Sequence, residues 1–357
     1  MRILAAYTYL SLGGVESVFR ARMDGFRSLG IEFRAWFLFD RGGRPMFTGH
    51  EANIEVGGID ALARHVREER YDLLLNIDTP AVQPAFAAAV GRPPIGVEFH
   101  TPYVENQAYL AQLGPAPPQG VLVPSVYQRC IARRLLAGDA RTTSVPVEVI
   151  PNPLRLDFAA PLRTPTALPP VPPVAWIGRL DDLKNWRGFL ALGAALAGAG
   201  MAHELWLAGK PIDPETGRAV VDTARWFGVL PQLRWYRGLP HERMPAFLDL
   251  VRAGGGVLTS TSRGESFGMT VAEAMARGCA VAVPDTPPFD EFVTDATGVR
   301  FATDPAAAAA EAVVALLADA RRRDRLGAAA RDAILARHAP AHALPTLAEA
   351  YRALAGR

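Results

Sequence analysis

Two glutamates eight positions apart, Glu265 and Glu273, stand in the stretch TSRGESFGMTVAEAMARG. The pattern predicts a turn at the first glutamate and a helix, starting near Met269, that contains the second. Eight residues make a little over two helical turns, so this helix brings Glu273 round to the face that its N-terminus presents. Carboxylates accept hydrogen bonds from hydroxyl groups, and we therefore expect the pair to bind a ligand that carries several hydroxyls.

The start of the same predicted helix offers a second kind of binding group. Ser266, Phe267, Gly268 and Met269 are expected to bind the ligand. The backbone amides of the last three are exposed at the helix N-terminus, and such a terminus attracts anions. A ligand with a phosphate and several hydroxyls would satisfy the amides and the carboxylates together. The residues alone leave an alternative, in which one glutamate favours the helix dipole and the other is solvated on the helix surface.

Two basic side chains follow an apolar strand pattern, VAWIG, earlier in the chain. Arg179 comes directly after it and Lys184 five residues later, and the only other lysine of the sequence is Lys210. Basic groups at one strand end can converge on a diphosphate, the arginine through its planar fork and the lysine as a point charge. Asp181 and Asp182 lie between them, so a local salt bridge is the alternative.

The first half of the chain contributes softer signals. Gly13 and Gly14 lie between the first strand and the first helix, where glycine lets the backbone approach a ligand closely, although a plain tight turn also explains them. His100 ends the strand pattern IGVEF and opens the loop HTPYVEN. Taken alone, a histidine at a strand end is more often a hydrogen-bonded structural residue.

These motifs together resemble the retaining GT-B glycosyltransferases of group one, which use nucleotide-activated sugars. The resemblance rests on Glu265 and Glu273 with seven residues between them, on AMARG after the second, and on Gly-Arg-Leu followed by lysine at Arg179 and Lys184. It implies that Glu273 holds the ribose hydroxyls and Glu265 the sugar hydroxyls. It also implies that Arg179 and Lys184 neutralise the donor diphosphate.

The resemblance further implies how the remaining motifs take part in the reaction. Gly13 and Gly14 would line the cleft near the sugar and the diphosphate, and His100 would lie against the transferred sugar. The residues given catalytic roles are His100, Arg179, Lys184 and Glu265. The same-face mechanism of the family uses the leaving phosphate to help deprotonate the acceptor. It needs no cofactor beyond the sugar nucleotide as co-substrate and no metal, and the chain has no Asp-x-Asp metal anchor.

Three segments depart from the family pattern. Pro153 in IPNP stands where glycine is usual, and Thr261 replaces the proline that is common before the first glutamate, which we expect to matter little. The segment TPPFDEFV takes the place of a Gly-Gly turn before a glutamate. Pro287 and Pro288 have no amide hydrogen to donate to the sugar nucleotide, whereas Glu291 could supply the matching carboxylate.

Alternating strand and helix patterns run along the whole chain and predict parallel sheets that are covered on both faces. Its 357 residues suit two domains, and six prolines between positions 161 and 173 mark a stiff link. We expect a GT-B fold, with two Rossmann-like α/β domains whose parallel sheets face a central cleft. The expected domains are residues 1–153 on the acceptor side, with helix 338–357 packing back on them, and residues 154–337 on the donor side.

The pattern predicts individual elements as well. Helices are expected over residues 58–70, 305–320, 321–337 and 343–356, the last after a break that ends at Pro345. The strand and loop RWYRGLP resemble the segment that borders the nucleobase in the family, although its aromatic residues would also fit a core.

Composition excludes several other classes of protein. The formal net charge is +2 without a long block of like charges, so a nucleic-acid-binding arm is not expected. Cys130 and Cys279 have no metal-ligand spacing, and no apolar run approaches the eighteen or so residues of a membrane span. The first ten residues do not form a convincing signal peptide. We expect a cytoplasmic protein, and a peripheral contact at the inner face of the membrane is compatible with this.

The sequence therefore predicts a hexosyltransferase-type enzyme that moves a sugar from a nucleoside diphosphate to an acceptor with retention. The acceptor would be a sugar, a lipid-linked carrier or a small molecule. Two alternatives share the fold, namely a nucleotide-sugar epimerase or hydrolase, and a sugar-nucleotide-binding subunit without turnover. The joint presence of both glutamates, the two basic residues and His100 argues against the last, because a decayed site would lose some of them.

Overall fold

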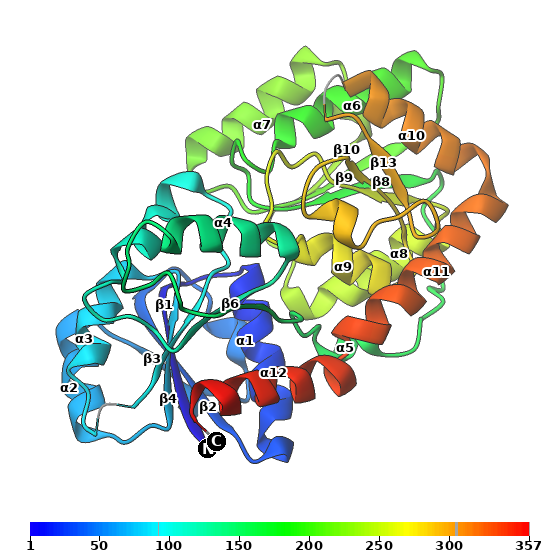
Figure 1. Ribbon diagram of the computed structural model, residues 1–357. Coiled ribbons are helices and arrows are strands. Elements are labelled where there is room, and N and C mark those ends of the chain that lie inside the picture. The colour runs from blue at the N-terminus through cyan, green and yellow to red at the C-terminus, as the bar shows by residue number, and fades with distance from the viewer. Residues whose placement is uncertain (92, 304–305, 357) are drawn as a thin grey trace. The chain divides into compact units, whose positions relative to one another are not determined.

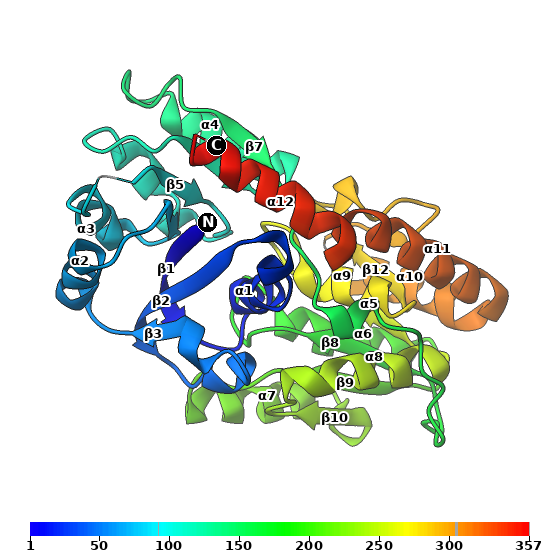
Figure 2. The ribbon, with the colours of Figure 1, turned by 90° about the horizontal axis from the view of Figure 1, so that it is seen from below.

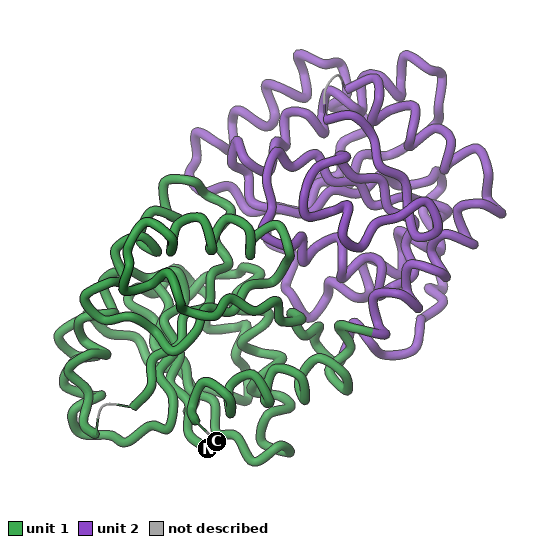
Figure 3. Tube along the Cα trace, viewed as in Figure 1, with its two compact units in different colours: residues 1–156, 337–357 green, residues 157–336 purple. Residues whose placement is uncertain are grey.

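The computed structural model describes residues 1–91, 93–303 and 306–356 and divides the chain into two compact units (Figure 1; Figure 3). Unit 1 comprises Met1–Leu156 and Arg337–Arg357, and unit 2 comprises Asp157–Ala336. The sequence had suggested boundaries at 153/154 and 337/338. Residue 305, which begins the expected helix 305–320, and residue 357, which ends the expected helix 338–357, lie outside the described residues.

Unit 1 is built on a seven-stranded parallel sheet with the order β3-β2-β1-β4-β5-β6-β7. Its strands are β1 (Arg2–Leu10), β2 (Glu32–Asp40), β3 (Ile54–Val56), β4 (Leu73–Ile77), β5 (Ile95–Glu98), β6 (Gly120–Val123) and β7 (Val147–Val149). The interior strand β4 is buried along its whole length, as expected for a parallel sheet that is covered on both faces. The edge strand β3 has only three residues, too few to produce a recognisable period, and the sequence did not predict it.

The helices of unit 1 are α1 (Gly14–Gly25), α2 (Ile59–Glu68), α3 (Gln83–Ala87), α4 (Val126–Leu136) and α12 (Pro340–Leu354). Helix α12 lies beside α1 in this unit (Figure 2), and the rings of Phe26 and Tyr351 are in edge contact at 5.8 Å. This last helix was expected near residues 343–356, after a break from His338 to Pro345, and the break is wrong, because the helix begins at Pro340 and contains Pro345. A proline is well suited to the first helical position, and burial of Leu344 and Leu347 outweighs the single backbone bond lost at Pro345.

Unit 2 is built on a six-stranded parallel sheet with the order β10-β9-β8-β11-β12-β13. Its strands are β8 (Pro173–Ile177), β9 (Glu204–Ala208), β10 (Leu233–Tyr236), β11 (Val257–Thr259), β12 (Ala280–Pro284) and β13 (Val299–Phe301). Its helices are α5 (Leu156–Ala159), α6 (Trp186–Gly198), α7 (Pro214–Trp226), α8 (Met244–Ala253), α9 (Met269–Ala276), α10 (Ala306–Ala318) and α11 (Ala320–His338). The prediction of two parallel α/β units is confirmed.

Helix α7 begins at Pro214, five residues before the apolar run AVVDTARWFG that indicates a helix in the sequence. Asp213 caps it, since its Oδ1 accepts a hydrogen bond of 2.6 Å from the amide of Thr216, and Pro214 follows as the first helical residue. An aspartate before a proline is a helix-start signal that hydrophobic periodicity alone does not detect.

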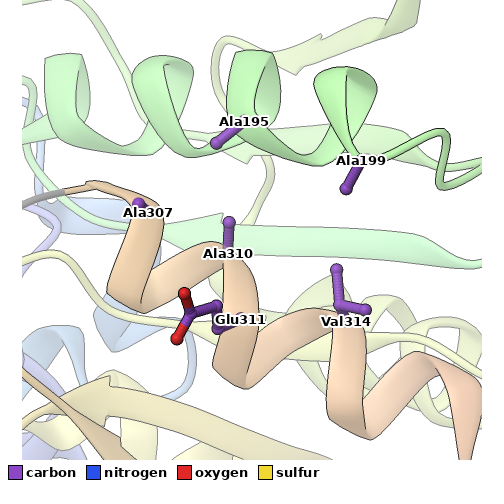
Figure 4. A pocket seen from close by; sticks show the side chains of 6 residues that line it. All are labelled: Ala195, Ala199, Ala307, Ala310, Glu311 and Val314. Carbon is purple, nitrogen blue, oxygen red and sulfur yellow. The ribbon is translucent and has the colours of Figure 1, made fainter.

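A hollow of about 260 Å³ lies between α6 and α10 and is lined by small side chains. Figure 4 shows Ala195 and Ala199 of α6 opposite Ala310 and Val314 of α10. None of the residues with predicted chemistry lines it, so we regard it as a packing feature of unit 2. Across the described residues, no helix combines the length and the apolar character needed to cross a bilayer.

Candidate active site

The strand order of unit 2 reverses beside β8. The chain proceeds from β8 outward through β9 and β10, and then returns to β11 on the other side of β8. Loops that leave two such neighbouring strands diverge at their carboxyl ends, and this is where open α/β sheets bind ligands. Residues 178–185 follow β8 and residues 260–268 follow β11, so the two motifs predicted to bind the donor meet at this point.

Hydrogen bonds join these two loops. The amide of Arg263 donates to the carbonyl of Leu183 at 2.8 Å. The Thr261 hydroxyl donates to the carbonyl of Asn185 at 2.8 Å and accepts from the indole of Trp176 at 3.1 Å. The expectation that threonine in place of proline matters little is therefore wrong, because a proline has no hydroxyl to make these bonds.

Lys184 and Glu265 form an ion pair across the two loops. The Lys184 Nζ lies 2.6 Å from Oε1 of Glu265, and the hydroxyl of Ser262 donates to the same oxygen at 2.8 Å. The side chains are 19% and 8% exposed, respectively, so the pair is shielded from water. An ammonium group has three donors, and the lysine can therefore keep its carboxylate partner while it contacts a phosphate.

Arg179 is placed differently from Lys184. Its side chain is 54% exposed, and its Nε lies 3.3 Å from Oδ2 of Asp181. The local salt bridge that the sequence left open as an alternative is thus present for the arginine. An exposed pair of this kind contributes little to stability, so the guanidinium could turn to a diphosphate at small cost.

Helix α9 begins at Met269, as the sequence predicted. It is preceded by Gly268, whose φ of +98° lies in the left-handed region, and a Cβ atom there would come within 2.7 Å of the Phe289 ring. The positive φ and the close approach to Phe289 therefore each require glycine at this position. The ring of Phe267 stacks on Phe292 at 5.1 Å, which fixes the turn in front of the helix. The first amides of a helix have no acceptor within it, so they can bind an anion.

In the proline-containing loop after β12, backbone amides form hydrogen bonds within the loop itself. The amide of Phe289 donates to the carbonyl of Thr286, and that of Glu291 donates to the carbonyl of Pro288, each at 3.0 Å. Pro287 and Pro288 have no amide hydrogen. These bonds support the prediction that the loop has few backbone donors for a sugar nucleotide, and the role of Glu291 stays a prediction.

Glu273 is buried inside unit 2, with 3% of its surface exposed. Its Oε1 lies 3.6 Å from Nε2 of His241, which the sequence analysis missed. The signal was available, because His241 follows the loop after β10 and strand ends at one edge of a parallel sheet are where ligands bind. A histidine beside Glu273 can supply either a hydrogen-bond donor or a positive charge.

In unit 1, the glycine pair lies at the start of α1, with Gly13 as the N-cap and Gly14 as the first helical residue. Buried Glu16 accepts hydrogen bonds from the amide and the hydroxyl of Ser11, at 2.7 and 2.6 Å. A Cβ atom at Gly13 would come within 2.7 Å of the Glu16 carboxylate. Glycine at position 13 therefore leaves room for the Glu16 carboxylate. This is a structural reason for the residue in addition to its predicted contact with the ligand.

His100 follows β5 and is held at two points in unit 1. Its Nε2 lies 2.8 Å from Oε2 of Glu98, and its backbone amide donates to both carboxylate oxygens of Asp78, at 3.1 and 3.0 Å. Burial alone would raise the pKa of Glu98, but the Arg22 guanidinium and the bond from His100 outweigh it and lower the pKa to about 2. Burial raises the pKa of Asp78 to about 7, although His100 opposes the shift.

Asp78→Asn is expected to change the pH dependence of stability. A carboxyl group whose pKa is raised in the folded state binds a proton there more tightly, so it stabilises the fold at low pH. This contribution is lost as the pH rises from about 4 to about 7, by no more than about 1.4 kcal/mol per pH unit. Urea unfolding of both proteins across this range measures it, and a constant difference between them would contradict the raised pKa.

Comparison with known proteins relates part of the sequence to a family and the fold to solved structures. Residues 172–333 match the family model of glycosyl transferases group 1. Anabaena HepE in complex with UDP-glucose has a TM-score of 0.83 at 17% identity, covering 99% of this chain and 100% of that one. Sucrose-phosphate synthase from Thermosynechococcus elongatus has a TM-score of 0.80 at 16% identity, covering 99% and 98%. A glycosyltransferase from Rickettsia africae has a TM-score of 0.75 at 15% identity, also covering 99% and 98%.

The family model confirms the resemblance to group 1 glycosyltransferases over residues 172–333, and the solved structures confirm the GT-B fold; retention during transfer stays a prediction. No curated protein sequence matches the chain. Within residues 1–91, 93–303 and 306–356, no group of three or more His, Cys, Asp or Glu side chains could hold a metal ion.

Proposed function

We propose that this protein is a retaining glycosyltransferase that moves a sugar from a nucleoside diphosphate to an acceptor. The observation that carries the proposal is the contact between Lys184 and Glu265 at the strand-order reversal of unit 2, directly before the N-terminus of α9. A basic side chain, a carboxylate and helix amides at one point suit a ligand with a diphosphate and hydroxyls.

The proposed mechanism follows from where charge develops. As the bond between the anomeric carbon and the leaving oxygen breaks, negative charge builds on the diphosphate. Arg179, Lys184 and the amides at the start of α9 would stabilise this charge electrostatically. The acceptor hydroxyl attacks from the face that the diphosphate leaves, and a phosphate oxygen takes its proton. Glu273 would hold the ribose, and Glu265 and His100 would contact the sugar.

A UDP-hexose is the first donor to test, because HepE was crystallised with UDP-glucose and shares the fold. The acceptor is proposed to be a sugar, a lipid-linked carrier or a small molecule. A lipid-linked acceptor would bring the protein, which we expect in the cytoplasm, to the inner face of the membrane. Incubation of the donor with the protein alone distinguishes the alternative functions. Without an acceptor, a hydrolase releases the sugar and an epimerase converts it.

Replacement of Glu273 and replacement of Glu265 are expected to affect ligand binding differently. Glu273→Gln keeps the shape of the side chain but removes the charge that would accept from two ribose hydroxyls, each such bond being worth about 1.5–3 kcal/mol. Binding of both the nucleoside diphosphate and the intact donor should therefore weaken. Glu265→Gln should leave the affinity for the diphosphate product nearly unchanged, while it reduces transfer and loosens discrimination between donor sugars.

Calorimetric titration of each variant with product and with donor measures these effects. Because Glu265 also pairs with Lys184, its replacement by glutamine leaves the lysine charge available to the diphosphate and gives no reason for weaker product binding. The assigned roles are wrong if Glu265→Gln weakens binding of the product as much as Glu273→Gln does.

Activity is expected to survive removal of divalent metal ions. In the proposed site, basic side chains and helix amides neutralise the diphosphate, so no metal is needed for this purpose. Initial rates with and without EDTA measure the dependence, after dialysis against the chelator. Complete loss of activity that Mn²⁺ or Mg²⁺ restores would show that a metal neutralises the leaving group.

A further inference from the structure

A buried polar network surrounds His100 in unit 1. Glu98 of β5 accepts hydrogen bonds from Arg22 of α1 and from His100 at 2.8 Å each, both at Oε2. The hydroxyl of Tyr351, in helix α12, donates to the other oxygen, Oε1. The side chains of Arg22 and Glu98 are fully buried, and the residue Tyr351 has no exposed surface either. Helices α1 and α12 and strand β5 lie within the same unit (Figure 3).

The arrangement follows from the alternation of the strand. Glu98 ends β5 and His100 follows it by two residues, the spacing at which side chains of a strand share a face, and the two side chains meet at 2.8 Å. Gly96 shares this face, and a Cβ atom there would come within 2.9 Å of Leu354, the last residue of α12. The C-terminal helix therefore packs directly over the face on which Glu98 lies.

The network determines which ring nitrogen of His100 carries hydrogen. An ionised carboxylate only accepts hydrogen bonds, so Nε2 of His100 must donate to Glu98. In the neutral imidazole, Nδ1 is then the acceptor, and it points away from Glu98. Among the residues that the structure describes, none bonds to Nδ1.

Stability does not account for this network. A buried ion pair contributes little net stability, because desolvation of both charges offsets their attraction. Nε and Nη1 of Arg22 have no hydrogen-bond acceptor among the described residues, and the guanidinium carbon lies 5.5–5.7 Å from the rings of Phe19, Phe33 and Tyr351. What the arrangement does achieve is a Glu98 carboxylate that is charged, fully hydrogen-bonded and fixed in place.

We propose that Glu98 is a positioning residue of the transferase site, which fixes His100 as the Nε2–H tautomer with Nδ1 directed to the sugar. Tyr351, near the C-terminus, holds Glu98 in turn. The inference rests on the proposed function, which puts His100 against the transferred sugar. In this state Nδ1 of His100 accepts a hydrogen bond from a sugar hydroxyl.

Glu98 is the charged group that hydrogen-bonds to the His100 ring among the residues that the structure describes. Arg22 lies on the other side of Glu98, and Asp78 bonds to the backbone amide of His100 and accepts from Tyr109 at 3.4 Å. Replacement of Glu98 should therefore release the ring from a single tautomer.

The tautomer can be measured directly in the full chain. With ¹⁵N-labelled histidine, long-range ¹H–¹⁵N spectra distinguish Nε2–H from Nδ1–H, and His100→Gln identifies the signal. We expect Nε2–H in the wild type and a mixture of tautomers in Glu98→Gln, whose amide can donate as well as accept. An Nδ1–H signal in the wild type, or an unchanged Nε2–H signal in Glu98→Gln, would overturn the proposal.

Tyr351→Phe provides a second test if Glu98→Gln does not fold. It removes only the hydroxyl that holds Glu98, so the His100 spectrum should change from Nε2–H towards a mixture of tautomers and kcat should fall. Phe26→Leu is the matched control, because Phe26 packs on the Tyr351 ring and has no group that could hydrogen-bond to Glu98. The proposal fails if Tyr351→Phe behaves like Phe26→Leu, with lower stability but an unchanged Nε2–H signal.

These readouts also distinguish failure of the inference from failure of the proposed function. The tautomer is observed without any turnover, so the predicted spectrum in a protein that transfers no sugar contradicts the function alone. Transfer activity together with a His100 tautomer that neither variant changes contradicts the positioning role alone.

Discussion

Lys184→Ala is expected to lower kcat by about two to three orders of magnitude, the usual cost of removing one preorganised charge partner from a transition state. The lysine is the less exposed of the two basic groups assigned to the diphosphate, and its Nζ lies 2.6 Å from Glu265. Its loss also leaves that carboxylate without its cation next to developing negative charge. The two effects act in the same direction, so the rate of transfer should respond more than donor binding.

Arg179→Ala should lower turnover strongly as well, since Arg179 is the second basic group proposed to neutralise the diphosphate. Steady-state kinetics with a UDP-hexose donor measures both variants. Arg225→Ala is a suitable control, because it removes a basic side chain from an exposed ion pair, Arg225 with Asp222, on helix α7. Near-normal kcat in both Lys184→Ala and Arg179→Ala would rule out the assigned diphosphate contact.

Arg277→Ala is expected to lower the free energy of unfolding by about 3–5 kcal/mol, as breaking a buried ion pair commonly does. Arg277 is 1% exposed, and its Nη2 contacts both carboxylate oxygens of buried Asp249, at 2.9 and 2.7 Å. Its guanidinium also donates to the carbonyls of Ala160 and Pro161, at 2.8 and 3.1 Å. Alanine would leave buried Asp249 and the carbonyl of Pro161 without the Arg277 donor, while the carbonyl of Ala160 would keep its bond of 3.0 Å from Arg331.

Urea unfolding followed by tryptophan fluorescence suits this measurement, because five of the six tryptophans lie in unit 2. The double variant Arg277→Met with Asp249→Leu removes both charges and should recover part of the loss. A double-mutant cycle gives the coupling energy of the pair. A loss below about 1 kcal/mol in Arg277→Ala, the range of an exposed pair, would contradict the structural role.

The sequence alone determined the features that depend on local spacing. The helix start at Met269, the turn in front of it and the alternation of strands and helices all follow from patterns within about ten residues. Where local signals compete, sequence reasoning failed, as at Pro345, where burial of the helix face outweighed a helix-breaking residue. The Asp-Pro pair at position 213 is a helix-start signal in the sequence, but a search for hydrophobic periodicity does not detect it.

Only the tertiary structure decided which of these residues meet. Lys184 and Glu265 are 81 positions apart and come together because β11 returns to the side of β8 that β9 leaves open. Tyr351 reaches Glu98 across 253 positions because the last helix packs back on the first sheet. Strand order and helix return depend on packing across the whole unit, and no local pattern of residues encodes them.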